Sequence, residues 1–137
     1  MNVYVLDTSV TLAWYRDEDF SEAARVWQRQ LMDGKLTLLV PGLHYWEFGN
    51  VLRTLVKREE MAESLAAEIY EVHLEAPLDL AEPERSAVFS TALEYQTTTY
   101  DAVYIALALS RDLPLITAER TSRQWVSRLG ARIEHVS

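Results

Sequence analysis

Four carboxylic acids in this 137-residue sequence lie where an α/β enzyme would place its reactive groups: Asp7, Glu47, Asp101 and Glu119. Two unit charges 4 Å apart repel by about 4 kcal/mol at an effective dielectric near 20, so carboxylates sharing a small site either take up protons or need a cation. Oxygen donors, with no cysteine and no paired histidine in the chain, favour Mg²⁺ or Mn²⁺ over zinc. Such a site polarises a phosphodiester and lowers the pKa of bound water. The residue types therefore predict phosphoester hydrolysis.

Each of these acids also has an ordinary structural explanation. Asp7 is suited to capping the helix that follows it, and Asp101 completes a Thr98-x-x-Asp capping-box pattern. Glu47 lies on the flank of an apolar helical stripe, and Glu119 is suited to a solvated loop. Taken singly, the structural interpretation is favoured for each. Because the four acids come from separate segments and fall at one edge of the expected sheet, the set as a whole favours chemistry.

Hydrophobic periodicity predicts an alternation of strands and helices. The expected strands cover residues 2–6, 36–40, 78–80, 114–116 and 131–136, and the expected helices cover 8–14, 22–32, 43–57, 61–74, 83–95, 100–110 and 121–129. Strand cores that are apolar throughout favour a parallel sheet covered on both faces. We therefore expect residues 1–137 to form a single α/β domain. Its binding crevice should lie beyond the carboxyl ends of the strands.

Three of these helices carry more specific expectations. Pro83 is expected at the first helical position of 83–95. In 61–74, the spacing predicts Leu65, Ile69 and Val72 on the buried face. The helix over 100–110 is apolar nearly all round and is expected to be covered on both sides.

The charge of the chain is unevenly distributed. Thirteen Lys and Arg stand against 21 Asp and Glu, a net charge of −8, but residues 59–84 hold nine acids and no Lys or Arg. Residues 103–133 carry a local charge of +3 from five arginines, which is compatible with RNA or DNA and equally with an ordinary solvated surface. The absence of cysteine, of a leader-like start and of an apolar run long enough for a membrane span predicts a cytoplasmic protein.

Four segments together resemble the PIN domain, specifically the VapC-type toxins: Asp7-Thr8-Ser9, Pro41 with Glu47-x-x-Asn50-Val51-Leu52, Thr99-Tyr100-Asp101-Ala102, and Leu115-Ile116-Thr117-Ala118-Glu119. The resemblance spans nearly the whole chain. It implies a three-layer α/β/α fold with a central parallel sheet in the order 3-2-1-4-5. It further implies an Mg²⁺- or Mn²⁺-dependent endoribonuclease, a cognate VapB-type antitoxin and a homodimer.

Carried over by position, the resemblance implies that Asp7, Glu47 and Asp101 are the core acidic triad and metal ligands. Glu119 matches a fourth acidic position that is more often Asp in the family, so it would act as a ligand directly or through water. Ser9 and Thr117 match hydroxyl positions expected to orient waters or ligands.

Other chemistry-bearing residues give weaker signals. His44, His73 and His135 show no ligand spacing and are expected to be structural or exposed. Most of the large aromatic residues should pack in the core, whereas Trp46 projects opposite the apolar face of its helix and is the best candidate for an interface residue.

Two other functional classes remain open. A phosphotransfer domain also gathers carboxylates at strand ends, but a receiver needs a lysine after a late strand, and the only lysines are Lys35 and Lys57. A phosphatase of the Asp-x-Asp type is disfavoured because residue 9 is serine. The third class is a catalytically silent RNA- or partner-binding module, which the retention of all four acids disfavours.

Overall fold

A parallel five-stranded sheet forms the centre of the protein, and the computed structural model describes it within residues 2–137. The strands are β1 (Val3–Leu6), β2 (Thr37–Val40), β3 (Asp79–Leu80), β4 (Leu115–Thr117) and β5 (Ile133–His135). They pair in the order β3-β2-β1-β4-β5, with β1 in the middle. The expected α/β fold and its strand order are confirmed.

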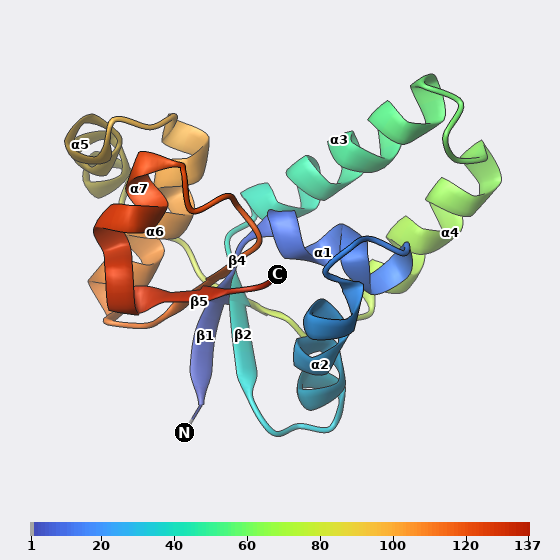
Figure 1. The fold of residues 1–137 in the computed structure, drawn as a ribbon, viewed down its shortest axis with the longest axis horizontal. Coiled ribbons are helices and arrows are strands. Elements are labelled where there is room, and N and C mark those ends of the chain that lie inside the picture. Colours follow the sequence, from blue (N-terminus) through green and yellow to red (C-terminus); the bar gives the residue numbers. More distant parts are fainter. Residues whose placement is uncertain (1) are drawn as a thin grey trace.

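Helices cover both faces of this sheet (Figure 1). They are α1 (Thr8–Tyr15), α2 (Ser21–Met32), α3 (Leu43–Lys57), α4 (Glu63–Leu74), α5 (Arg85–Tyr95), α6 (Thr99–Arg111) and α7 (Gln124–Leu129), with a 3₁₀ turn at Gly130–Arg132. In Figure 1, α1 and α2 lie on one side of the strands and α5, α6 and α7 on the other, while α3 and α4 form a projecting hairpin. Within residues 2–137, no helix combines the length and apolar character that crossing a bilayer requires.

The three central strands, β2, β1 and β4, are largely apolar on both faces because each face packs against helices. Val5, Leu39 and Leu115 point towards α6 and α7, where they pack with residues such as Ile105 and Trp125. Their strand neighbours point the opposite way and pack with α1 and α2, as successive side chains of a strand must. As expected, α6 is buried on most sides, from Ala102 through Ala108.

A third cluster joins α3 to α4 through Phe48, Leu52, Ala66 and Ile69. The predicted buried face of α4 was wrong at two of its three positions, because Leu65 is 47% and Val72 is 52% exposed. Ala66, Ile69 and His73 are buried in their place, and they also recur at helical spacing. Ala66 packs in this cluster with α3, and His73 lies on the same buried face of α4.

Several helix boundaries differ from the predicted ones by one to three residues, most notably the starts of α5 and α7. Helix α5 begins at Arg85, with Glu84 in an extended conformation before it, so Pro83 is not a first helical residue. Helix α7 begins at Gln124, because residues 119–123 form an irregular turn that ends with Arg123 in an extended conformation. The last strand is shortened to Ile133–His135 by the preceding 3₁₀ turn.

Truncation of the sheet core should destabilise the fold without altering its surface. Leu38 is fully buried in β2, so Leu38→Ala should lower the free energy of unfolding by about 2–5 kcal/mol. Urea denaturation followed by circular dichroism measures this, with Leu93→Ala in α5 as the control because Leu93 is 66% exposed. The control should stay within about 0.5 kcal/mol of wild type. Equal losses in both variants would contradict the described burial.

Candidate active site

All four predicted carboxylates line one cavity at the carboxyl ends of the strands. The cavity has a volume of about 190 Å³ and is lined by Asp7, Thr8, Ser9, Glu47, Val51, Asp101 and Glu119. Asp7 follows β1, Glu47 comes from α3, Asp101 from α6, and Glu119 from the turn after β4. The strand order brings these distant segments together, since β1 pairs directly with β4.

Asp7 is held by two hydroxyl groups, one from the first turn of α1 and one from the end of β4. Its Oδ2 accepts hydrogen bonds from Ser9 Oγ at 2.8 Å and from Thr117 Oγ1 at 2.7 Å. Each hydroxyl in turn accepts a backbone N–H, from Ala118 and Glu119 respectively, so its single proton is directed at Asp7. The Asp7 side chain makes no capping hydrogen bond to α1, which removes its ordinary structural explanation.

Burial raises the pKa of Asp7 to about 7. The hydrogen bonds from Thr117 and Ser9 act in the opposite direction, while the nearby charges of Glu119 and Asp101 raise the pKa further. The carboxylates are therefore close enough to repel one another. Asp7 is the most deeply buried of them, with 8% of its surface exposed, and is the acid whose negative charge most needs a cation.

Glu47 is held by two other hydroxyl groups. Its Oε1 accepts hydrogen bonds from Tyr104 at 2.6 Å and from Thr8 Oγ1 at 3.1 Å. Burial raises the pKa of Glu47, these two bonds lower it, and the charge of Asp101 raises it. The hydroxyls thus offset part of the penalty for keeping this carboxylate ionised.

Asp101 takes part in only half of the predicted capping box. Its backbone N–H donates to Thr98 Oγ1 at 3.1 Å, as an N-cap interaction requires. Its carboxylate accepts from the Thr97 hydroxyl at 2.9 Å and is not the partner of the Thr98 backbone. Capping therefore explains the backbone of Asp101 but leaves its side chain at the cavity.

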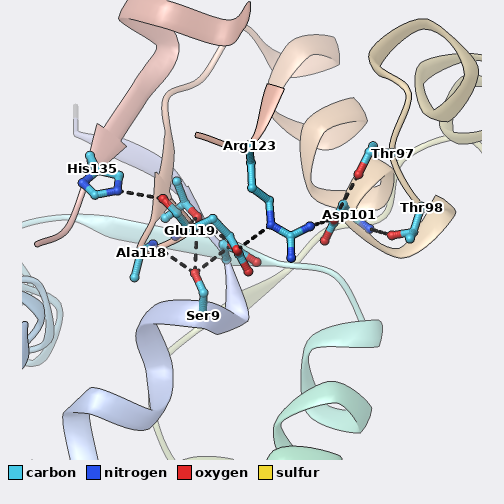
Figure 2. Close-up of polar contacts among 10 residues, drawn as sticks. Ser9, Thr97, Thr98, Asp101, Ala118, Glu119, Arg123 and His135 are labelled. Atoms are coloured by element: carbon cyan, nitrogen blue, oxygen red, sulfur yellow. Dashed lines mark hydrogen bonds and ion pairs between the residues drawn. The ribbon is translucent and has the colours of Figure 1, made fainter. Parts of the chain in front are cut away.

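Arg123 bridges the two remaining acids, as Figure 2 shows. Its Nε lies 3.1 Å from Glu119 Oε2, and its guanidinium reaches within 3.9 Å of Asp101 Oδ2. Glu119 is fixed further by its carbonyl, which accepts a hydrogen bond from the exposed His135. One positive charge thus faces a cavity that four carboxylates line.

Comparison with protein families identifies the chain. The family model of the PIN domain matches residues 4–124. The chain belongs to the PIN domain family. Among curated proteins, none matches this sequence.

Solved structures share the fold of this PIN domain. PAE2754 from Pyrobaculum aerophilum is 22% identical, with a TM-score of 0.69 over 96% of this chain and 83% of that one. VapBC2 from Rickettsia felis, solved bound to a DNA fragment from the promoter, is 10% identical, with a TM-score of 0.67 over 98% and 99% of the two chains. VapBC-1 from nontypeable Haemophilus influenzae is 16% identical, with a TM-score of 0.59 over 97% of each.

The donor chemistry of the PIN cavity suits a hard divalent cation. Within residues 2–137, hydrogen bonds and ion pairs engage one oxygen of each carboxylate: Oδ2 of Asp7 and Asp101, Oε1 of Glu47 and Oε2 of Glu119. The second oxygen of each is left for another ligand. In this described part of the chain, no three acidic or histidine side chains are yet gathered tightly enough to enclose an ion. The residues therefore fit such a cation in type and location, and the acids would have to draw closer around it.

Sequence reasoning missed five residues that build this site: Thr8, His44, His73, Tyr104 and Arg123. Tyr104 lies three residues after Asp101, on the same helical face, and this spacing was a usable signal. His44 contacts the Thr8 hydroxyl, and His73 contacts His44. These contacts join different helices, so the spacing of residues in the sequence gave no signal for them. The three histidines were expected to be structural or exposed, and His44 and His73 are fully buried while His135 is exposed.

The raised pKa of Asp7 predicts a pH-dependent stability in metal-free protein. A folded-state pKa near 7, above the ordinary 3.8, means that folding retains a proton on Asp7 that the unfolded chain releases. The stability linked to this proton is full below pH 4 and is lost as the pH rises to about 7. Asp7→Asn should remove this loss and be more stable than wild type at pH 8, by a few kcal/mol at about 1.4 kcal/mol per pKa unit.

Urea denaturation at a series of pH values from 4 to 9, with EDTA present, measures the difference between wild type and Asp7→Asn. The difference is the readout because the lowered pKa values of His44 and His73 act on the same curve with the opposite sign. Glu68→Gln on the exposed face of α4 is the control and should run parallel to wild type. A constant difference between wild type and Asp7→Asn would contradict the description of Asp7.

Proposed function

We propose that this PIN domain is a metal-dependent endoribonuclease and the toxin of a VapBC-type toxin–antitoxin pair. The observation that carries the proposal is the convergence of four carboxylates from separate elements on one cavity. Membership of the PIN family supports a nuclease. The toxin assignment draws its support from the shared fold of the two VapBC structures.

In this proposal Asp7, Glu47 and Asp101 bind Mg²⁺ or Mn²⁺, and Glu119 completes the acidic set directly or through water. When bound, such a cation polarises the phosphodiester and lowers the pKa of the attacking water. Ser9 and Thr117 keep Asp7 oriented by donating their protons to its Oδ2. Tyr104 and Thr8 do the same for Glu47. The products would carry 5′-phosphate and 3′-hydroxyl ends, as the family resemblance implies.

The proposed partners follow from charge and exposure. Arg120 and Arg123, which follow Glu119 in the chain, would neutralise RNA phosphates beside the acidic cavity. A basic segment of a VapB-type antitoxin complements that cavity and would exclude the metal. Trp46 is 75% exposed, and we propose it as an interface residue, with a homodimer as its expected use. The proposed location is the cytoplasm.

A catalytically silent, partner-binding PIN module is the alternative function. The observation that favours it is Arg123, whose guanidinium engages both Asp101 and Glu119. A phosphotransfer domain has less support, since β4 is followed by Ala118 and Glu119 and the only two lysines of the chain are Lys35 and Lys57.

Conservative replacement of the acids tests the nuclease directly. Asp7→Asn, Glu47→Gln and Asp101→Asn should each reduce RNA cleavage at least about 100-fold, because a metal contributes several kcal/mol to the transition state. Glu119→Gln should have a milder effect. Cleavage is measured by mapping and counting the 5′ ends of cut RNA in Mg²⁺, Mn²⁺ or EDTA. Glu68→Gln should cut like wild type. Unchanged cleavage by Asp7→Asn or Asp101→Asn would rule out these roles.

Arg123 should compete with the metal for the acids it engages. Arg123→Gln removes the positive charge beside Asp101 and Glu119 and should tighten Mn²⁺ binding about two- to fivefold, the range of a partly exposed ion pair. Electron paramagnetic resonance of free Mn²⁺ measures the affinity. Arg120→Gln is the control, because Arg120 is exposed and forms no salt bridge within residues 2–137. Weaker binding by Arg123→Gln would instead indicate that the guanidinium orders the site.

A further inference from the structure

A continuous chain of hydrogen bonds runs through the core from Tyr15 towards the candidate site. The Tyr15 hydroxyl lies 2.7 Å from His73 Nδ1, and the Nε2 atoms of His73 and His44 lie 2.8 Å apart. His44 Nδ1 lies 3.0 Å from Thr8 Oγ1. The chain thus links α1, α4 and α3 and returns to α1 at the wall of the acidic cavity.

At the cavity the chain ends on Glu47. Thr8 Oγ1 lies 2.5 Å from the Tyr104 hydroxyl, which donates to Glu47 Oε1 at 2.6 Å. A longer contact of 3.1 Å joins Thr8 directly to the same oxygen. Glu47 is therefore the acceptor at the end of this chain of hydrogen bonds.

Both imidazoles are neutral. His44 and His73 are fully buried, and their rings pack against aromatic neighbours that include Tyr45 and Phe48. Burial lowers the pKa of His44 to about 3 and of His73 to about 4, and the neighbouring His73 contributes to the first of these shifts. A neutral imidazole has one N–H donor and one acceptor nitrogen. Each ring therefore donates a hydrogen bond to one neighbour in the chain and accepts one from the other.

An ionised Glu47 fixes that direction. The carboxylate only accepts, so Tyr104 donates to it, and the proton in the short Thr8–Tyr104 contact comes from Thr8, which shares this single proton with Glu47 Oε1 at 3.1 Å. Thr8 then accepts from His44 Nδ1–H. If the direction were reversed, Thr8 would donate its proton to His44 Nδ1. The Thr8 and Tyr104 hydroxyl oxygens, which lie 2.5 Å apart, would then have no proton between them.

The same reasoning continues to the far end of the chain. With its proton on Nδ1, His44 accepts at Nε2, so His73 donates from Nε2. His73 Nδ1 is then an acceptor, which the Tyr15 hydroxyl satisfies. Each link in this direction contains one proton.

We infer that Tyr15, His73 and His44 form a one-way hydrogen-bond relay that holds Thr8 and Tyr104 as donors to the Glu47 carboxylate. These three are positioning residues for a metal ligand, and in this respect the inference rests on the proposed function. The relay carries no charge and delivers no proton. It favours the carboxylate form of Glu47 and holds that carboxylate in one orientation, and three hydrogen bonds separate Glu47 from His44 along the relay.

The tautomers of the two histidines are the first test. In metal-free wild-type protein, ¹⁵N NMR of the imidazole nitrogens should show His73 protonated on Nε2 and His44 protonated on Nδ1. The reverse pair of tautomers, or an average of both on each ring, would overturn the relay. A packing role alone would not select this pair.

Removal of the first donor is the second test. Tyr15→Phe keeps the ring but leaves His73 Nδ1 without a donor, so the preference of both imidazoles for these tautomers should weaken measurably. Mn²⁺ affinity should fall about two- to tenfold, the range that one neutral hydrogen bond supports. This variant is preferred to His73→Phe, which strands a buried nitrogen of His44 and is expected to unfold.

Tyr45→Phe is the matched control. The Tyr45 ring also packs against both histidines, with centroids 5.2 and 5.9 Å away, but within residues 2–137 its hydroxyl has no hydrogen-bond partner. This variant should keep the wild-type tautomers and Mn²⁺ affinity. Equal effects of Tyr15→Phe and Tyr45→Phe, measured at a temperature where both are folded, would overturn the relay.

The two proposals fail in different ways. If wild-type protein binds no Mn²⁺ and cuts no RNA, the nuclease proposal is lost, and the relay is decided by the tautomers of wild type and Tyr15→Phe alone. If wild type binds Mn²⁺ and cuts RNA but shows the reverse tautomers, the relay is lost and the nuclease stands.

Discussion

Mutual repulsion among carboxylates is the constraint on which this structure depends. The parallel sheet places β1 beside β4, so Asp7 and Glu119, which follow these strands, lie close together. Helices α3 and α6 bring Glu47 and Asp101 to the same cavity of about 190 Å³. Left alone, such a set would take up protons. The side chains around it oppose this in three ways: hydroxyls donate to Asp7, hydroxyls donate to Glu47, and Arg123 lies between the other two acids.

These supports are unequal, and the difference has a physical reason. Asp101 and Glu119 lie nearer to solvent and share a guanidinium. Asp7 lies deepest and has only neutral donors, which do not outweigh the burial that raises its pKa. The carboxylate whose ionised form is least favoured, that of Asp7, therefore lies at the centre of the site. Strain of this kind is expected where a protein keeps a charge for function and not for stability.

The sequence predicted the sheet well because its central strands are largely apolar on both faces, a pattern typical of a covered parallel sheet. The strand order came from the family resemblance and not from periodicity. Convergence of the four acids followed from their positions after strands. The prediction was wrong for α4, since Leu65-Ile69-Val72 and Ala66-Ile69-His73 both recur at helical spacing and hydrophobicity favoured the exposed set. Periodicity alone does not separate two faces one residue apart.

The error in α4 and the unexpected relay have the same cause. A buried polar network stabilises a fold only when all of its members are satisfied. In residues 2–137 the only buried side-chain nitrogen or oxygen atoms without a partner are Thr11 Oγ1 and Trp125 Nε1, and neither belongs to the network. His73 finds its partners, Tyr15 and His44, only if α4 turns its histidine inward, which leaves the more hydrophobic Leu65 and Val72 at the surface. The orientation of the α3–α4 hairpin is thus set by the same hydrogen bonds that end on Glu47. The packing of α4 and the alignment of Glu47, a candidate metal ligand, consequently depend on the same hydrogen bonds.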